Sequence, residues 1–210
     1  MRLNNVTLEE YFQEHIYSPL GMTSTTFRFE NHPDIQKRLV KTAERMGDGT
    51  FREASKHWPD FAAEDCAGTG LYSTVEEYMR VLGDLIKDNP ILLKRETIER
   101  EMFTAQLPRD SASHAGLLAS SHILKVMIGS PDGPKGINWG LGGMLFEEDV
   151  GPFKAGTLFW GGYSNLTWFT NRREGIAGFY ASQVLPTGDP ATINLVHSWI
   201  NELWRNRSSR

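Results

Sequence analysis

The chain has a single cysteine, no excess of basic charge and no long apolar run, and each shortage excludes a class of protein. A single cysteine, Cys66, allows no disulfide within the chain. The 22 lysines and arginines are outnumbered by 26 acidic residues, giving a net charge of −4, so we expect no nucleic-acid partner. No apolar run is close to the length of about 20 residues that a membrane span requires. The segment Met1–Asn5 lacks the apolar region of a signal peptide. We therefore expect a cytoplasmic protein with no membrane span.

Metal-binding and cysteine-nucleophile patterns are also lacking. The six histidines include no His-x-x-x-His or His-Glu-x-x-His spacing, so we expect neither a metal nor another cofactor. A cysteine nucleophile needs a positive environment that lowers the pKa of its thiol. The neighbours of Cys66 are instead two acids, Glu64 and Asp65, which we expect to raise that pKa. The sequence thus disfavours Cys66 as a catalytic residue.

Helix signals dominate the first part of the chain. Thr7 and Glu10 have the spacing of a capping box, and the helix that they open should stop near Pro19 and Gly21. Its apolar positions recur at helical spacing, at Leu8, Tyr11, Phe12 and Ile16. A second capping box, Ser73-Thr74-Val75-Glu76, opens a helix that ends near Asn89. The apolar spacing of this helix predicts that Tyr78 packs in the core.

Between and after these helices, three further segments are predicted. Lys37–Met46 and Thr50–Ala54 flank an Asp-Gly pair, which is typical of a β-hairpin. Arg95–Phe103 is predicted as a helix. Arg109–Leu118 mixes small and polar residues and is predicted as a loop.

From residue 137 onward the pattern favours strands. Four runs separated by short turns predict an antiparallel meander, over residues 138–147, 156–162, 165–170 and 175–184. Asp189 and Pro190 are typical of the N-cap and first position of a last helix, whose apolar stripe should cover one face of the sheet. We therefore predict an α+β fold, with a helical and loop region over about 1–136 and strands plus a C-terminal helix over about 137–205.

Two adjacent glycines interrupt an aromatic strand at Trp160-Gly161-Gly162-Tyr163. Glycine inside a strand marks a bulge or a place where a ligand approaches the backbone. We expect an edge strand here that lines a cleft and offers a backbone N–H to a developing oxyanion.

This strand resembles the third motif of the serine β-lactamase-like family, which includes class C β-lactamases, esterases and fungal transesterases. That motif reads Lys, His or Trp, then Thr, Ser or Gly, then Gly, and the tryptophan form is that of the esterases and transesterases. Three other blocks are similar to family segments and follow in the family's order: Tyr17–Phe27 (YSPLGMTSTTF), Ala67–Tyr78 (AGTGLYSTVEEY) and Asn138–Met144 (NWGLGGM). The resemblance implies a partial β-lactamase/transpeptidase-like fold.

Two upstream motifs of that family are missing. The family's nucleophile lies in Ser-x-x-Lys, where the lysine amine deprotonates the hydroxyl, and no lysine here follows a serine by three; Ser121 and Lys125 are four apart. The second motif, Tyr-x-Asn or Tyr-Ser, should precede the first helix, but only Met1–Val6 stands there. Tyr163-Ser164-Asn165 has the spelling but follows the third motif. The resemblance therefore predicts the C-terminal portion of a family member.

The resemblance implies a serine acyl hydrolase or acyltransferase that acts, when complete, on a small acyl ester or thioester. Trp160, Gly161 and Gly162 would form the cleft motif, and Tyr163 would give its backbone N–H to the oxyanion hole. No catalytic residue is predicted in this chain, so we expect it to be inactive alone. Two alternatives stay open: a non-catalytic binding protein derived from the family, and a new serine centre at Ser164. Self-association or a complementing chain is also expected.

Overall fold

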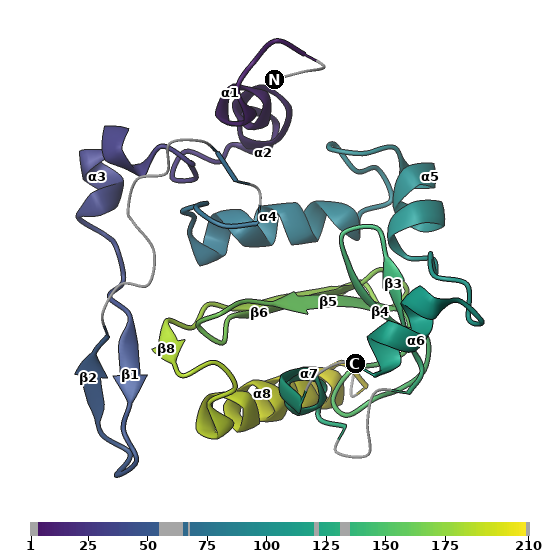
Figure 1. Ribbon diagram of the computed structural model, residues 1–210. Helices are drawn as coiled ribbons and strands as arrows, with labels where there is room; N and C mark the ends of the chain where they lie inside the picture. Colours follow the sequence, from purple (N-terminus) through teal and green to yellow (C-terminus); the bar gives the residue numbers. More distant parts are fainter. Residues whose placement is uncertain (1–3, 55–64, 67, 120–121, 131–134, 209–210) are drawn as a thin grey trace.

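The computed structural model describes residues 4–54, 65–66, 68–119, 122–130 and 135–208. At its centre an antiparallel sheet lies between two helical layers (Figure 1). Helix α4 (Val75–Leu85) covers one face, and α8 (Pro190–Ser208) with α7 (His122–Ile128) covers the other. This arrangement confirms the predicted α+β fold. Across the described ranges, no helix combines the length and the apolar character that crossing a bilayer requires.

The five strands of the main sheet follow one another in chain order, and every neighbouring pair is antiparallel. They are β3 (Ile137–Gly140), β4 (Gly143–Phe146), β5 (Thr157–Gly161), β6 (Thr167–Asn171) and β7 (Ile176–Tyr180). The predicted meander is confirmed. Residues 138–147, however, are a hairpin rather than one strand. The chain reverses at Leu141-Gly142, where Gly142 has a φ of 95°, which a glycine adopts without strain.

The main core lies between the sheet and α8. As predicted, Asp189 caps this helix: its carboxylate accepts hydrogen bonds from the Thr192 backbone N–H (2.9 Å) and hydroxyl (2.6 Å). The apolar stripe of α8 packs against aromatic rings of the sheet, with Val196 and Ile200 buried in one cluster with Phe146, Phe159 and Phe169. Full burial of such side chains contributes about 1.5–3 kcal/mol each, so this layer supplies much of the stability.

The cap of α4 lies one residue later than predicted. Thr74, not Ser73, is the N-cap, and its hydroxyl accepts a hydrogen bond from the Glu77 backbone N–H at 3.2 Å. The Ser73 hydroxyl is instead hydrogen-bonded to that of Thr25 at 2.7 Å. The local pattern assigns the Ser73 side chain to the helix cap, but the long-range contact with Thr25 engages it instead.

Helix α4 packs on the sheet through Tyr78, as predicted. The Tyr78 ring lies 4.6 Å from that of Phe179 in β7, measured between centroids. Burial raises the pKa of Tyr78. The contact carries no polar chemistry, so the interpretation of Tyr78 as a packing residue stands.

The first helix is continuous but changes its winding. It comprises α1 (Leu8–Phe12), a π-helical turn η1 (Gln13–Tyr17) and α2 (Ser18–Leu20), and it ends at Gly21, whose φ is 65°. The predicted capping box is present: the Glu10 N–H donates to the Thr7 hydroxyl at 3.1 Å, and the Thr7 N–H donates to the Glu10 carboxylate at 2.7 Å. From residue 8 to residue 20 only Tyr17 is buried. The apolar face of this helix is thus incompletely covered.

A small sheet lies beside the main one. The hairpin of β1 (Ala43–Arg45) and β2 (Phe51–Glu53) turns near Gly49, as predicted, although both strands are shorter than expected. Short β8 (Val184–Leu185) adds to β1 in parallel. Before the hairpin come η2 (Phe29–Asn31) and α3 (Pro33–Gln36).

The prediction of a loop at residues 109–118 is wrong. Residues Ala112–Leu118 form α6, and the Ser111 hydroxyl caps it by accepting a hydrogen bond from the His114 N–H at 3.1 Å. The His114 ring is buried, with its two nitrogens 3.1 Å from the carbonyl oxygens of Arg109 and Ile137. Contacts made by this side chain fix a helix that small residues alone would not predict. The helix expected at 95–103 is confirmed as α5 (Arg95–Thr97) and η3 (Ile98–Met102).

Candidate functional site

Two of the family-like blocks, about 50 residues apart in the chain, lie side by side. Thr26 and Tyr72 exchange backbone hydrogen bonds, at 3.0 Å from the Thr26 N–H and 2.9 Å from the Tyr72 N–H. The Tyr72 ring stacks on that of Phe29 at 4.1 Å between centroids. The blocks Tyr17–Phe27 and Ala67–Tyr78 therefore form one structural unit, with Ala67 itself outside the described residues.

The buried carboxylate of Glu77 joins these blocks. It accepts hydrogen bonds from the backbone N–H groups of Thr23 (2.6 Å) and Ser24 (2.9 Å) and from the Thr25 hydroxyl (2.6 Å). Burial acts to raise the pKa of Glu77, but the hydrogen bonds from Thr25, Thr23 and Ser24 outweigh it, and the pKa is lowered. Glu77 is thus a charged structural residue.

The strand that carries Trp160 is the middle strand of the sheet, so the prediction of an edge strand is wrong. The β3–β4 hairpin covers the side of β5 that was expected to be open. The register between β4 and β5 ends at Phe159, whereas Trp160 and Gly161 pair with Trp168 and Thr167 of β6. The last two residues of β5 therefore extend past the end of its pairing with β4.

Of the two features that the glycine pair was expected to mark, a bulge or a close approach of a ligand, the bulge is absent at Gly161. The register of β5 with β6 is uninterrupted from Thr157 to Gly161. A Cβ atom on Gly161 would lie 2.5 Å from Met127 Cε and 2.9 Å from the Leu166 carbonyl oxygen, and one on Gly162 would lie 3.0 Å from the Leu166 side chain. The two glycines therefore allow close packing against α7 and against the β5–β6 turn.

Tyr163-Ser164-Asn165 forms this turn and has a structural role. The buried Ser164 hydroxyl donates to the Ser182 carbonyl at 3.1 Å. The Asn165 side chain donates to the carbonyls of Val184 (2.9 Å) and Pro186 (2.7 Å) and accepts from the Gly188 N–H (2.6 Å). These contacts attach the turn to residues 182–188. They speak against Ser164 as a serine nucleophile, because its hydroxyl is buried and engaged.

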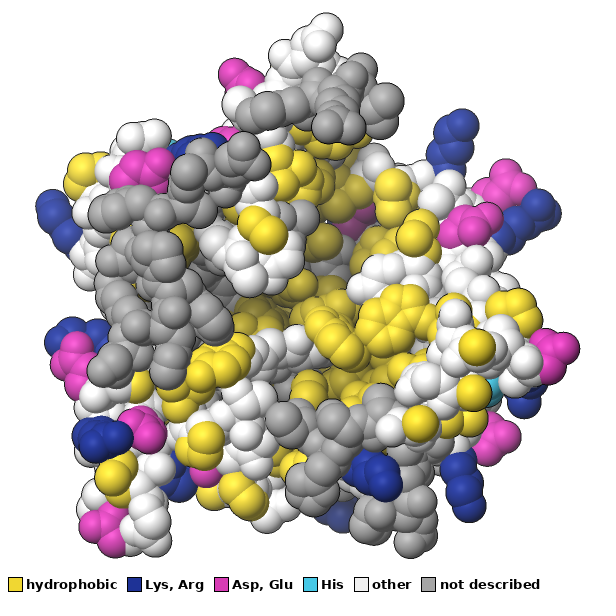
Figure 2. Space-filling view, in the orientation of Figure 1, with side chains coloured by type: hydrophobic (Ala, Val, Ile, Leu, Met, Phe, Trp, Pro, Cys, Tyr) yellow, Lys and Arg dark blue, Asp and Glu magenta, His cyan; other side chains and the backbone are white. Residues whose placement is uncertain are grey.

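We define as the aromatic surface three side chains near this turn: Trp139 of β3, Trp160 of β5 and Tyr163 of the turn itself. Trp160 is 41% exposed and Tyr163 44% exposed. The Trp139 ring meets that of Trp160 edge to face, at 4.9 Å between centroids. Figure 2 shows hydrophobic side chains around a hollow in the face of the molecule shown there. Sequence reasoning missed Trp139 as a site residue, although it lies in the family-like block Asn138–Met144.

The expectation for the Cys66 thiol is wrong. Its pKa is lowered, because the Thr69 hydroxyl and the backbone N–H groups of Gly68 and Thr69 donate hydrogen bonds to the sulfur. The carboxylate of Asp65 points to Arg28, 2.5 Å from its guanidinium, and accepts from the Glu9 N–H. Glu64, the other expected influence, and Ser121, the serine nearest to a lysine pattern, lie outside the described residues.

Comparison with known proteins gives the family. The family model "Beta-lactamase" matches residues 2–197. The acyltransferase calJ of Penicillium decumbens is 37% identical over 204 residues, which cover 95% of this chain and 48% of that protein. The lovastatin esterase of Penicillium rubens is 30% identical over 221 residues, covering 99% of this chain and 53% of the esterase.

Solved structures give the same relationship. Simvastatin synthase (LovD) from Aspergillus terreus, as its LovD6 mutant, superposes with a TM-score of 0.89 at 28% identity, over 100% of this chain and 52% of that one. The chain thus spans about half the length of the curated relatives it matches. It belongs to the beta-lactamase family, and the relatives named here are fungal acyltransferases and esterases of that family.

Proposed function

We propose that this chain forms one side of an acyl-transfer cleft of the esterase and transesterase type. The observation that carries this proposal is the position of Trp160-Gly161-Gly162 at the end of β5, where the side chains of Trp160 and Tyr163 are exposed. Trp160 and Tyr163 would contact the acyl group of a small ester or thioester. The Tyr163 backbone N–H would stabilise the oxyanion of the tetrahedral intermediate.

The chain alone is proposed to be inactive. Ser-x-x-Lys, the source of the nucleophile and its base, is absent from the sequence, and without it the covalent acyl-enzyme step is lost. The family's second oxyanion donor, the backbone N–H of the nucleophilic serine, is lost with it, and one such donor contributes about 3 kcal/mol. Assignment to the C-terminal portion, the division near residue 136 and a cytoplasmic location stay predictions.

Two assays test this proposal together. The purified chain is incubated with p-nitrophenyl butyrate and with a fluorophosphonate probe, followed by mass spectrometry of the intact protein. We expect hydrolysis at the rate of the buffer and no added probe mass. Turnover with stoichiometric labelling of any serine would overturn the proposed inactivity, and a Ser164→Ala variant would show whether that serine is Ser164.

A second candidate function is binding of a complementing polypeptide. The observation that favours it is the exposure of the aromatic side chains of Trp160 and Tyr163. Exposed apolar surfaces of this kind mark interaction sites. The partner would carry the part of a family member that this chain does not match, including Ser-x-x-Lys.

Co-expression tests the second candidate. The unmatched half of the calJ acyltransferase, carrying an affinity tag, is co-expressed with this chain. We expect the two to co-purify in equal amounts and to react with the fluorophosphonate probe. The test variant is Trp160→Ser on the aromatic surface. Its matched control is Leu195→Ser on α8, because the Leu195 side chain is also exposed. Equal loss in both variants, or no co-purification, would contradict this candidate.

A further inference from the structure

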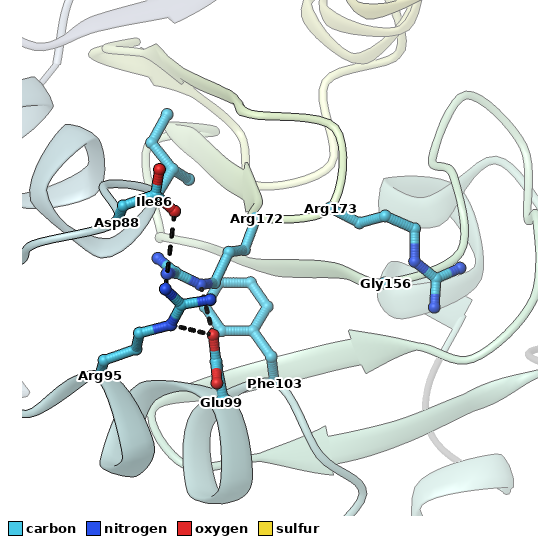
Figure 3. A pocket seen from close by; sticks show the side chains of 8 residues that line it. All are labelled: Ile86, Asp88, Arg95, Glu99, Phe103, Gly156, Arg172 and Arg173. Atoms are coloured by element: carbon cyan, nitrogen blue, oxygen red, sulfur yellow. Dashed lines mark hydrogen bonds and ion pairs between the residues drawn. The ribbon is translucent and has the colours of Figure 1, made fainter.

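A pocket with a volume of about 370 Å³ lies at the opposite end of β5 from Trp160. It is bordered by Ile86 at the end of α4, by Arg95 and Glu99 of the α5–η3 helix, and by Arg172 and Arg173 in the β6–β7 turn (Figure 3). Gly156, which lines the pocket, and Trp160 are four residues apart along the strand, about 13 Å at 3.3–3.4 Å per residue. The pocket is therefore remote from the aromatic surface.

Two of its three arginines are engaged within the protein. Arg95 contacts the Glu99 carboxylate at 2.7 Å, and Arg172 contacts the same carboxylate at 3.4 Å. Arg172 also donates to the carbonyl oxygens of Leu85 (2.9 Å) and Lys87 (2.6 Å). The Arg172 side chain is 12% exposed. Arg172 therefore has a structural role at the end of α4 and does not bind a ligand.

Arg173 differs from both. Figure 3 shows its guanidinium apart from the Arg95–Glu99–Arg172 cluster, and among the described residues no ion pair or hydrogen bond involves it. It also lines an adjacent pocket, whose other charges are paired: Lys154 with Asp149 at 2.7 Å, and Arg207 with Glu174 at 3.4 Å.

One positive charge is thus left uncompensated where the two pockets meet. Every other charged side chain that lines them faces an opposite charge; for Asp88 this is Arg95, at 3.8 Å. A guanidinium presents a planar fork of N–H donors that matches a carboxylate. Ile86 and Phe103 add apolar surface to the first pocket.

We propose that this pocket binds a small monocarboxylate with an apolar body, and that Arg173 binds its carboxylate. The charge count selects a monoanion, because a phosphate monoester carries close to two negative charges at neutral pH and would leave one of them unmatched. The Phe103 ring would contact the apolar body. This site is independent of the proposed acyl transfer, since it contains none of Trp160, Gly161, Gly162 and Tyr163.

The test is a titration of the full chain with 4-fluorobenzoate at constant ionic strength, followed by fluorine NMR. 4-Fluorophenyl phosphate and 4-fluorobenzyl alcohol are the arms that vary charge. We expect saturable binding of the benzoate and weaker binding of the other two. Arg173→Ala should weaken benzoate binding at least about tenfold, because a charge-assisted bidentate pair is lost, and Arg173→Lys should restore part of it.

Arg100→Ala is the matched control. Arg100 lies on the neighbouring helix η3, is 75% exposed, pairs with Glu96 at 2.7 Å and does not line the pocket. Its removal changes the net charge as Arg173→Ala does and should leave benzoate binding unchanged. No saturable binding, equal weakening in both variants, or tighter binding of 4-fluorophenyl phosphate than of 4-fluorobenzoate would each overturn the proposal.

Discussion

A single buried carboxylate joins the two family-like blocks Tyr17–Phe27 and Ala67–Tyr78. Glu77 is 5% exposed and accepts hydrogen bonds from three successive residues, Thr23, Ser24 and Thr25. A glutamine side chain has one acceptor oxygen and an NH₂ group that cannot accept. A buried donor left unpaired costs about 1–3 kcal/mol. The second carboxylate oxygen of Glu77 therefore stabilises the conformation of residues 23–25.

We predict that Glu77→Gln lowers the free energy of unfolding by about 2 kcal/mol. The control is Glu76→Gln on the same helix. Glu76 has a 79% exposed side chain and pairs only with Arg80, so its change should stay within about 0.5 kcal/mol. Urea denaturation followed by tryptophan fluorescence measures both. Equal effects would mean that the hydrogen bonds of Glu77 add no stability.

The same residue makes stability depend on acid. The pKa of Glu77 is lowered in the folded chain, so its contribution is complete above the unfolded value of about 4.3 and is lost as the pH falls through the folded value. The urea midpoint of the parent chain should therefore fall between pH 5 and pH 3. In Glu77→Gln the fall should be shallower, and an identical slope in both proteins would contradict this assignment.

At the scale of elements, the sequence predicts the helix caps and turns that depend on residues close to one another in the chain. The caps at Thr7 and Asp189 and the turn at Gly49 are present because each depends on neighbouring residues. Helix α6 was missed because the burial of His114 includes a contact with the Ile137 carbonyl, which lies 23 residues further along the chain. Long-range contacts thus decide what local patterns leave open.

In the candidate site, too, the sequence predicts local features but not those that depend on tertiary contacts. The motif Trp160-Gly161-Gly162 could be found from its spelling. Its position in a central strand could not, because the β3–β4 hairpin is a tertiary neighbour. The close packing at Gly161 could not be predicted for the same reason, because Met127, which a Cβ atom there would meet, belongs to the separate helix α7.

Three glycine substitutions test these elements. Gly83 in α4 and Gly116 in α6 have open space where a Cβ would stand, so replacement of either by alanine should raise the free energy of unfolding by about 0.5–1 kcal/mol. Gly161→Ala should lower it by about 1–3 kcal/mol, because the new methyl group would overlap Met127 and Leu166. Thermal denaturation checks all three. Destabilisation by Gly116→Ala would mean that α6 is not a helix in solution.

At the scale of the whole molecule, Arg172 connects parts that are distant in the sequence. Its guanidinium joins the end of α4, the helix η3 and the β6–β7 turn. We predict that Arg172→Ala lowers the free energy of unfolding by about 2 kcal/mol, since its charged hydrogen bonds contribute about 1.5–3 kcal/mol. Arg173→Ala, in the same turn but exposed, should leave stability nearly unchanged. Equal urea midpoints for the two variants would contradict this role.

The exposed aromatic surface should make the isolated chain associate with itself. Trp160 and Tyr163 are 41% and 44% exposed, and burying such rings is favourable at about 25 cal/mol per Å². We expect the sedimentation coefficient to rise with concentration. The double variant Trp160→Ser, Tyr163→Ser should abolish that rise, while Leu195→Ser, which removes a 56% exposed side chain from α8, should not. A chain that sediments as a monomer at every concentration would show that this surface is stable in water without a partner.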